Sequence, residues 1–304
     1  MSQIESTSKP RDVEEGIDRH FYRPIGYVLA RMSHAFALSP NDVTIISIAI
    51  GIAAGHLFYY PDLQTNLVGM LLLAIAEAMD SADGQLARMT DARSRFGRIL
   101  DGFATNLIFV SIYLHLCLRI IAAGGSAWIV VVALASGISH SFQCAIADYY
   151  RNAYLYFVYG EHRGEQDTSA GVQQLYRELT WRHHPLRKFL LRVYLNYTLQ
   201  QELLTATFSR IYAEAGHVFG TNIPVDVQRE YARRNRPLLK YYNVITANTR
   251  MIALCVSLLA GMPVLYLVFE LVVLNAVLGY IAVRQHRLNL SMLETLRQMN
   301  RAGM

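Results

Sequence analysis

The sequence has little charge. Only 17% of its 304 residues are Asp, Glu, Lys or Arg, whereas 53% are hydrophobic. An average soluble domain carries about 25% charged residues, so the composition argues against a soluble globular protein and favours a membrane protein. Basic residues outnumber acidic ones, 28 to 23. In a membrane protein such an excess lies in cytoplasmic loops beside anionic lipid, so we do not interpret it as nucleic-acid binding.

Cysteine is scarce as well. Cys117, Cys144 and Cys255 all sit in apolar runs, their number is odd, and their spacing matches no metal-binding motif. We therefore interpret them as buried thiols without a chemical role. The first forty residues are polar, so we expect no cleavable signal peptide. Internal repeats and low-complexity stretches are also lacking.

Apolar segments of the length that crosses a membrane recur along the chain. A span needs about 20 mainly apolar residues. We predict six spans, at 43–60, at 67–87, at 99–121, at 127–150, from near Tyr241 to Gly261, and from Pro263 to Val283. The fold class we expect is an all-α polytopic membrane protein with six transmembrane helices, an N-terminal interfacial amphipathic helix and a helical cytoplasmic insertion.

The basic residues divide the connections between these spans into two groups. Segments 61–66, 122–126 and 261–263 contain no Lys or Arg, whereas the other connections and the tail are rich in Arg. Positive charge stays on the cytoplasmic side, so we expect both termini and the loop at Arg88 to face the cytoplasm, in a bacterial inner membrane. Arg119 lies near the opposite end of the third span, where its long side chain can snorkel to the surface.

The chain divides into five parts on this topology. Residues 1–40 form a cytoplasmic or interfacial segment, and residues 41–156 hold the first four spans. Residues 157–240 form a cytoplasmic helical insertion. Residues 241–284 hold the last two spans, and residues 285–304 form a cytoplasmic tail.

Two of the polar segments carry helical patterns. Residues 12–38 place apolar side chains at helical spacing among arginines, which predicts an interfacial helix broken near Pro24. Within the insertion, apolar residues from Leu186 to Ile211 follow a 3.6-residue period. This stripe fits a helix packed on its own domain, and it equally fits a helix on the membrane surface or a cover over the active site.

The strongest chemical signal is a cluster of carboxylates. Asp80 and Asp83 are three residues apart, which places them on one helical face with Cβ atoms roughly 5–6 Å apart. Asp101 begins the next span on the same side of the membrane. A carboxylate within a span costs about 2.5–3.5 kcal/mol on insertion scales, and three of them also repel one another. The alternative is that these residues cap helices or pair with loop arginines.

A compensating cation explains the cluster better. Carboxylate oxygens suit Mg²⁺ or Mn²⁺, and Mg²⁺ commonly completes its coordination with substrate phosphates. Gly84 and Ala87 lie on nearly the same face and leave room for a ligand beside the backbone. The residues alone therefore predict a cytoplasm-facing metal site, held by Asp80, Asp83 and Asp101, for a phosphorylated ligand.

The same segment resembles the signature of the CDP-alcohol phosphotransferases, D-x2-D-G-x2-A-R-x8-G-x3-D-x3-D. Seven of the eight fixed positions match with every spacing correct, at Asp80, Asp83, Gly84, Ala87, Arg88, Gly97 and Asp101. Upstream, residues 40–44 resemble the P-N-x-[LVI]-T motif that begins the family's first helix. The resemblance covers roughly residues 12–156 and 241–284 and leaves the insertion outside.

The resemblance implies a reaction and a set of roles. An alcohol hydroxyl attacks a CDP-linked donor and CMP leaves, in phospholipid or related lipid synthesis. Asp80, Asp83 and Asp101 would bind Mg²⁺ or Mn²⁺, and the CDP group would lie against Asn41, Thr44, Asp80, Gly84, Ala87, Arg88, Gly97 and Asp101. Homodimers occur in the family, whereas no residue of this sequence indicates one. The other implied partners are an alcohol or lipid acceptor and membrane lipids.

The sequence departs from the signature at its fourth aspartate, which is Thr105 here. The resemblance implies that this aspartate serves as the general base and often as a metal ligand. A Thr hydroxyl does not accept a proton near neutral pH. Helix 127–150 offers His140 on a polar stripe, and imidazole has a suitable unperturbed pKa for a base. The alternative is that His140 packs and that the acceptor's phosphate or water removes the proton. For acceptor binding we single out Gln143, Asp148, Arg151, Lys240 and Arg250.

Three functions remain open at this point. The first is a phosphotransferase that uses a CDP-linked donor. The second is a non-catalytic relative that binds CDP-lipid and metal, which Thr105 would fit. The third is a cation or substrate transporter, although transporter sites tend to lie near the midplane between repeats, and the sequence shows no repeat.

Overall fold

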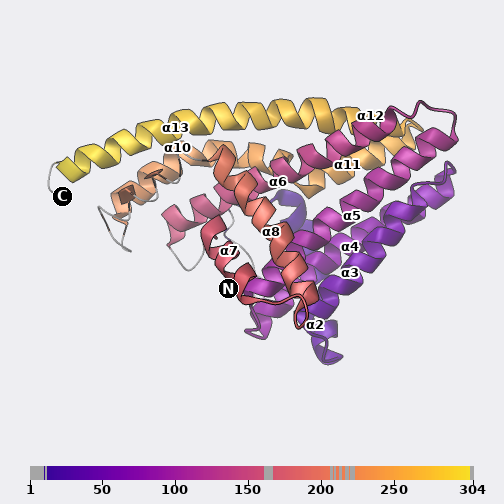
Figure 1. The fold of residues 1–304 in the computed structure, drawn as a ribbon, viewed down its shortest axis with the longest axis horizontal. Helices are drawn as coiled ribbons and strands as arrows, with labels where there is room; N and C mark the ends of the chain where they lie inside the picture. The colour runs from indigo at the N-terminus through magenta and orange to yellow at the C-terminus, as the bar shows by residue number, and fades with distance from the viewer. Residues whose placement is uncertain are drawn as a thin grey trace. The chain divides into compact units, whose positions relative to one another are not determined.

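A computed structural model describes residues 10, 12–160, 167–205, 208, 210, 211, 214, 215, 219 and 223–301 (Figure 1). All regular elements among these residues are helices, which confirms the predicted all-α class. Residues 1–9, 161–166 and 302–304 belong to the predicted N-terminal segment, insertion and tail, and they lie outside the described residues, as do residue 11 and several positions between 206 and 222.

Five helical segments within the described part of the chain are long and apolar enough to cross a membrane: Pro40–Leu57, Arg95–Ala122, Ile129–Tyr159, Val225–Leu259 and Pro263–Met299. They overlap five of the six predicted spans. The remaining predicted span, 67–87, lies within helix α4 (Leu63–Met89), which carries Glu77, Asp80 and Asp83 and is not among the five. The chain is thus an all-α polytopic membrane protein.

The chain forms two compact units. The first consists of Met1–Ser139, Pro185–Leu190 and Met251–Leu271. The second consists of His140–His184, Leu191–Arg250 and Val272–Met304.

The first unit is built on α3 (Pro40–Leu57), α4 and α5 (Arg95–Ala122), which lie side by side in Figure 1. Ser39 and Asp42 begin α3 with a capping box, in which each side chain accepts a hydrogen bond from the other residue's backbone N–H. Glycines let α3 approach α5 closely. A Cβ atom at Gly51 would lie 2.5 Å from Ile108, and one at Gly55 would lie 2.6 Å from Ser111 Oγ.

The N-terminal helix is continuous through Pro24. A π-helical turn, η1 (Asp18–Tyr22), leads directly into α2 (Arg23–Ala35), so the predicted break near Pro24 is wrong. The backbone N–H of Arg23 bonds to Asp18 O in the wider register, and Pro24 falls in the first turn of α2, where a missing N–H is tolerated. Helix α2 packs on α4, and Gln85 Nε2 donates to Arg23 O at 3.1 Å.

Arg119 does not snorkel to the surface. Its side chain is buried, and its guanidinium donates to Phe58 O at 3.3 Å and to Asn66 Oδ1 at 3.2 Å. The carbonyl oxygen of Pro61 lies 3.5 Å away. Arg119 therefore satisfies carbonyl groups that the end of α3 and the following turn leave without helical partners.

Helix α6 (Ile129–Tyr159) runs from the first unit into the second. The insertion supplies α7 (Ser169–Glu178), α8 (Pro185–Leu204) and most of α10 (Val225–Val244). The chain continues through α11 (Ala247–Leu259), α12 (Pro263–Val268), the π-helical η2 (Phe269–Leu274) and α13 (Asn275–Arg301). The fifth predicted span, from near Tyr241 to Gly261, takes in the end of α10 and the whole of α11.

Polar side-chain contacts join α10 to α13. Helix α10 packs along α13, and Gln285 of α13 bonds to Tyr242 at 2.5 Å and to Asn235 at 2.8 Å. Near the other end of the pair, Arg234 donates to Ser291 at 2.8 Å. These partners lie some 43–57 residues apart in the chain, so hydropathy along the sequence does not reveal them.

Candidate active site

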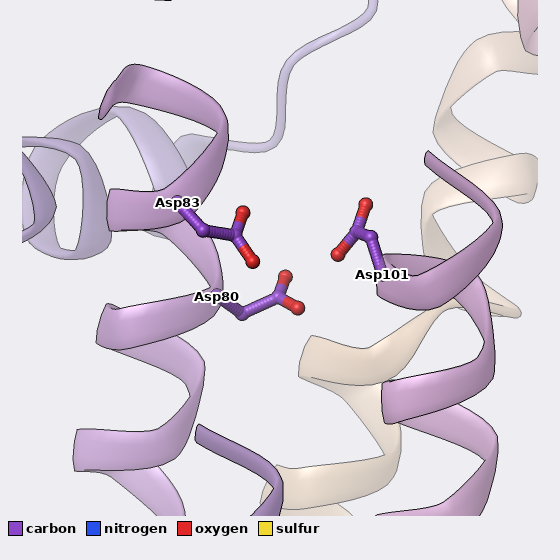
Figure 2. A group of neighbouring side chains, drawn as sticks. All are labelled: Asp80, Asp83 and Asp101. Carbon is purple, nitrogen blue, oxygen red and sulfur yellow. The ribbon is translucent and has the colours of Figure 1, made fainter. Parts of the chain in front are cut away.

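Three carboxylates meet in the first unit. Asp80 and Asp83 project from α4 and Asp101 projects from α5 toward them (Figure 2). One oxygen of each can be chosen so that all three lie within 4.8 Å of one another. Asp83 is buried, whereas Asp80 and Asp101 are half-buried. The structure thus brings together the three residues that the sequence predicts as metal ligands.

Local structure places these side chains. Ser94 caps α5 by accepting a hydrogen bond from Gly97 N at 2.9 Å, which fixes where the helix begins. Only residues 90–94 separate α4 from α5, so the two helices run in opposite directions. The last turns of α4 therefore face the first turns of α5, and Asp80 lies within electrostatic range of Asp101.

Thr44 holds the buried carboxylate. Its hydroxyl donates to Asp83 Oδ2 at 2.5 Å across the contact between α3 and α4. Thr44 is itself buried, 2% exposed, so the bond is shielded from water. Hydrogen bonds from neighbouring groups commonly orient carboxylate ligands of metals. Thr44 was predicted as a neighbour of the ligand, and the structure gives it this positioning role as well.

Asn41 and Gly97 lie side by side. A Cβ atom at Gly97 would lie 3.2 Å from Asn41 Oδ1 and 3.1 Å from Ser94 Oγ, so a larger residue would crowd both. Gly97 thus keeps the first turn of α5 close to the first turn of α3. The two predicted CDP-binding residues are brought together at the end of the bundle that carries the aspartates.

Arg88 offers hydrogen-bond donors at the same end. Its Nε and Nη2 atoms are buried, and neither has a hydrogen-bond partner among the described residues. Its guanidinium lies beside Gly84, where a Cβ atom would be 3.4 Å from Nη1, and within electrostatic range of Asp83. Buried donors are almost always satisfied in proteins, so these two fit an anionic ligand such as a phosphate.

The donor set fits a divalent cation. Three carboxylates at this separation repel one another, and oxygen ligands at such a spacing suit Mg²⁺ or Mn²⁺. Thr105 occupies the position of the signature's fourth aspartate, one turn beyond Asp101 on the same face of α5, and it is half-buried. Because Thr is uncharged, this position adds no negative charge to the site.

The remaining predicted residues belong to the second unit. His140 is buried, and its Nε2 lies 3.5 Å from Cys144 Sγ. Gln143 donates to Asn275 at 3.0 Å and accepts a hydrogen bond from Arg250. Arg250 also donates to Ile245 O at 2.6 Å. These contacts agree with the alternative in which His140 is a packing residue.

The other predicted acceptor-binding residues have partners too. Asp148 accepts a hydrogen bond from Tyr197 of α8 at 2.5 Å, and Arg151 donates to Asn243 at 2.7 Å. Lys240 is exposed, with its ammonium 4.9 Å from the centre of the Tyr241 ring. The structure therefore brings His140, Gln143 and Arg250 into one network, and leaves Asp148, Arg151 and Lys240 in separate contacts.

Sequence reasoning overlooked Glu77. It lies one helical turn before Asp80 on α4, within electrostatic range of Asp101. Its spacing from Asp80 is the same as that between Asp80 and Asp83, so the helical period could have revealed it. It was passed over because it lies outside the signature.

Comparison with known proteins supports the family resemblance. Residues 37–154 match the CDP-alcohol phosphatidyltransferase family, which confirms the resemblance for this part of the chain. A stretch of 94 residues is 35% identical to archaetidylinositol phosphate synthase of Pyrococcus horikoshii, and it covers 31% of this chain and 46% of that protein. The chain thus spans about half the length of the curated relative it matches.

Proposed function

We propose, from the CDP-alcohol phosphatidyltransferase domain that residues 37–154 form, that the protein transfers a substituted phosphate group from a CDP-linked donor to an alcohol acceptor. CMP is released, and the product is a phospholipid or a related lipid. The observation that carries this proposal is the placement of Asp80, Asp83 and Asp101, which lie within the matched region with ligand oxygens inside 4.8 Å.

The aspartates would hold Mg²⁺ or Mn²⁺. When bound, the cation neutralises negative charge on the donor's diphosphate and on the departing CMP. Thr44 keeps Asp83 oriented for this role. Arg88 would donate its buried N–H groups to a phosphate oxygen, a charge-assisted bond stronger than one between neutral groups.

The transfer requires one bond to form and one to break. The acceptor's hydroxyl oxygen bonds to the phosphorus that carries the donor's alcohol group. The bond from that phosphorus to the oxygen bridging to CMP breaks, and CMP leaves with the electron pair. The hydroxyl proton must pass to a base, and Thr105 does not take it near neutral pH.

We propose His140 as that base, on the sequence argument. Losing a positioned base typically lowers a rate by about 10²–10⁴-fold. His140→Ala should therefore reduce turnover by this order while the dissociation constant of CDP stays unchanged. Turnover close to that of the wild type would eliminate His140 and leave the acceptor's phosphate or water to remove the proton.

The acceptor is not fixed by any of these residues. The relative's name, archaetidylinositol phosphate synthase, makes inositol phosphate the first acceptor to assay. Gln143, Asp148, Arg151, Lys240 and Arg250 remain the residues we propose for acceptor binding. We further propose that the aspartates and both termini face the cytoplasm of a bacterial inner membrane.

The test is CMP release by the purified protein in detergent with Mg²⁺ or Mn²⁺. Donors would be CDP-diacylglycerol, CDP-archaeol and CDP-choline, each combined with inositol phosphate, glycerol phosphate, serine or a lipid alcohol. We expect CMP and a lipid product in equal amounts for one pairing. Thr105 favours one rival function, that of a non-catalytic relative that binds CDP-lipid and metal. Stabilisation by CDP without turnover of any pairing would support that rival and contradict the proposal.

A further inference from the structure

Glu77 occupies the site-bearing face of α4. It precedes Asp80 by three residues, so its side chain leaves the helix on the same side, about one turn away. It is half-buried. Unlike the three aspartates, it belongs to no position of the family signature.

The antiparallel course of α4 and α5 brings Glu77 level with Thr105. Asp80 faces Asp101 between the two helices (Figure 2). Glu77 lies three residues before Asp80 on α4, and Thr105 lies four residues after Asp101 on α5. At 1.5 Å per residue, these steps are about 4.5 Å and 6 Å, and they point the same way because the helices run in opposite directions. Glu77 and Thr105 therefore lie at nearly the same depth.

The charged surroundings of Glu77 are all acidic. The carboxylates that act on it electrostatically are Asp18, Glu15 and Asp101. Asp80 in turn feels Glu77 together with Asp101 and Asp83. Among the described residues, Glu77 forms neither an ion pair with a basic side chain nor a hydrogen bond. A proton or a cation would stabilise a half-buried carboxylate that lies among other carboxylates.

We propose that Glu77 supplies the fourth carboxylate ligand of the cation centre, in place of the aspartate that the signature has at the position of Thr105. This inference rests on the proposed function, because it assumes that Asp80, Asp83 and Asp101 bind a divalent cation. The fourth carboxylate would then come from α4 instead of α5, at nearly the same depth. The oxygens of Glu77 lie outside the group within 4.8 Å that the three aspartates form. Its side chain, one methylene longer than that of Asp, would turn toward the cation when the cation binds.

The experiment measures Mn²⁺ binding to the full-length protein in detergent, without nucleotide, by titration followed with electron paramagnetic resonance. Glu77→Gln should weaken Mn²⁺ binding at least about tenfold, the scale on which even outer partners of a metal site change affinity. The double variant Glu77→Gln/Thr105→Asp should recover most of this loss. Thr105→Asp alone should raise Mn²⁺ affinity much less, because Glu77 already supplies the fourth carboxylate.

The matched control is Asp62→Asn. Asp62 caps the opposite end of α4, and Asn is an equally good cap, so this variant removes one negative charge from the same helix without touching the site. We expect its Mn²⁺ affinity to equal that of the wild type. Thermal unfolding of each metal-free variant reports whether it folds.

Two results would overturn the inference and separate it from the proposed function. If the wild type binds Mn²⁺ and Glu77→Gln binds it as tightly, Glu77 is not a ligand, while the three-aspartate site stands. If Glu77→Gln binds weakly but the double variant does not recover, the loss comes from packing at position 77, and the inference is equally wrong. Absence of Mn²⁺ binding in the wild type would contradict both the inference and the metal site of the proposed function.

Discussion

At the scale of single residues, the site depends on hydrogen bonds that fix its ligands. Asp83 is buried, and a buried carboxylate that can rotate would bind a cation less well than one held in place. The Thr44 hydroxyl holds it through a 2.5 Å bond. We therefore propose Thr44 as a positioning residue that acts through Asp83.

Replacing Thr44 by Val tests this role, because Val has nearly the same shape and lacks the hydroxyl. We expect Thr44→Val to lower Mn²⁺ affinity about 10–100-fold, as measured by isothermal titration calorimetry. The control is Thr90→Val, since the Thr90 hydroxyl bonds to Leu86 O at the end of α4, away from the aspartates. Equal Mn²⁺ affinities for the two variants would show that Thr44 has no part in positioning Asp83.

The signature residues could be predicted because the chemistry lies in local spacing. Asp80 and Asp83 share a helical turn, and Asp101 begins the next helix after a short loop, so their approach follows from the sequence alone. Glu77 obeys the same period, but its relation to Thr105 depends on the direction of two facing helices. That relation appears only once α4 and α5 are placed side by side.

At the scale of helices, the positions of the aspartates depend on how closely α3 packs against α5. Gly55 of α3 lies against Ser111 and the backbone nitrogen of Ile112. A methyl group there would lie 3.1 Å from that nitrogen, and a backbone atom inside a helix does not move aside easily. The close contact therefore requires glycine at this position.

Gly55→Ala should accordingly lower the thermal unfolding temperature, because overpacking typically costs about 1–3 kcal/mol. The same substitution at Gly102 is the control. A Cβ atom at Gly102 meets nothing within 4 Å, so Gly102→Ala should stabilise α5 by about 0.5–1 kcal/mol. Unfolding followed by circular dichroism in detergent measures both. An unfolding temperature for Gly55→Ala at or above that of the wild type would contradict the close packing.

Helix boundaries were predictable where the sequence itself marks them. Ser39, Asp62 and Ser94 begin α3, α4 and α5 as side-chain caps. The pairing of α10 with α13 could not be predicted from the sequence, because Asn235 and Tyr242 bond to Gln285, some forty to fifty residues further along the chain. The sequence predicts a break near Pro24 because the π-helical turn that accommodates this residue has no simple sequence signal.

At the scale of the whole molecule, charge predicts the orientation in the membrane. The connections 61–66, 122–126 and 261–263 lack Lys and Arg, whereas Arg88, Arg93, Arg95 and Arg98 lie in and beside the loop that joins α4 to α5. Arg119, near the uncharged side, is buried and bonded to backbone carbonyls, so it does not compete with this pattern. The loop beside the aspartates should thus face the cytoplasm.

Labelling of single cysteines with an impermeant thiol reagent in intact cells tests this orientation. Cys117, Cys144 and Cys255 would first be replaced. We expect Gln64→Cys and Ser126→Cys to be labelled from outside and Arg93→Cys to be labelled only after the cells are permeabilised. All three positions are exposed on the protein surface. Labelling of Arg93→Cys alone in intact cells would show that the topology is the reverse of the predicted one.

The central claim is that Asp80, Asp83 and Asp101 bind a divalent cation together with the CDP group. The most direct measurement is CDP binding by isothermal titration calorimetry, with Mn²⁺ and with EDTA, for the wild type and each Asp→Asn variant. We expect CDP to bind the wild type only with Mn²⁺, and each variant to bind it more weakly while still folding. Equally tight CDP binding by all three variants in EDTA would contradict the claim.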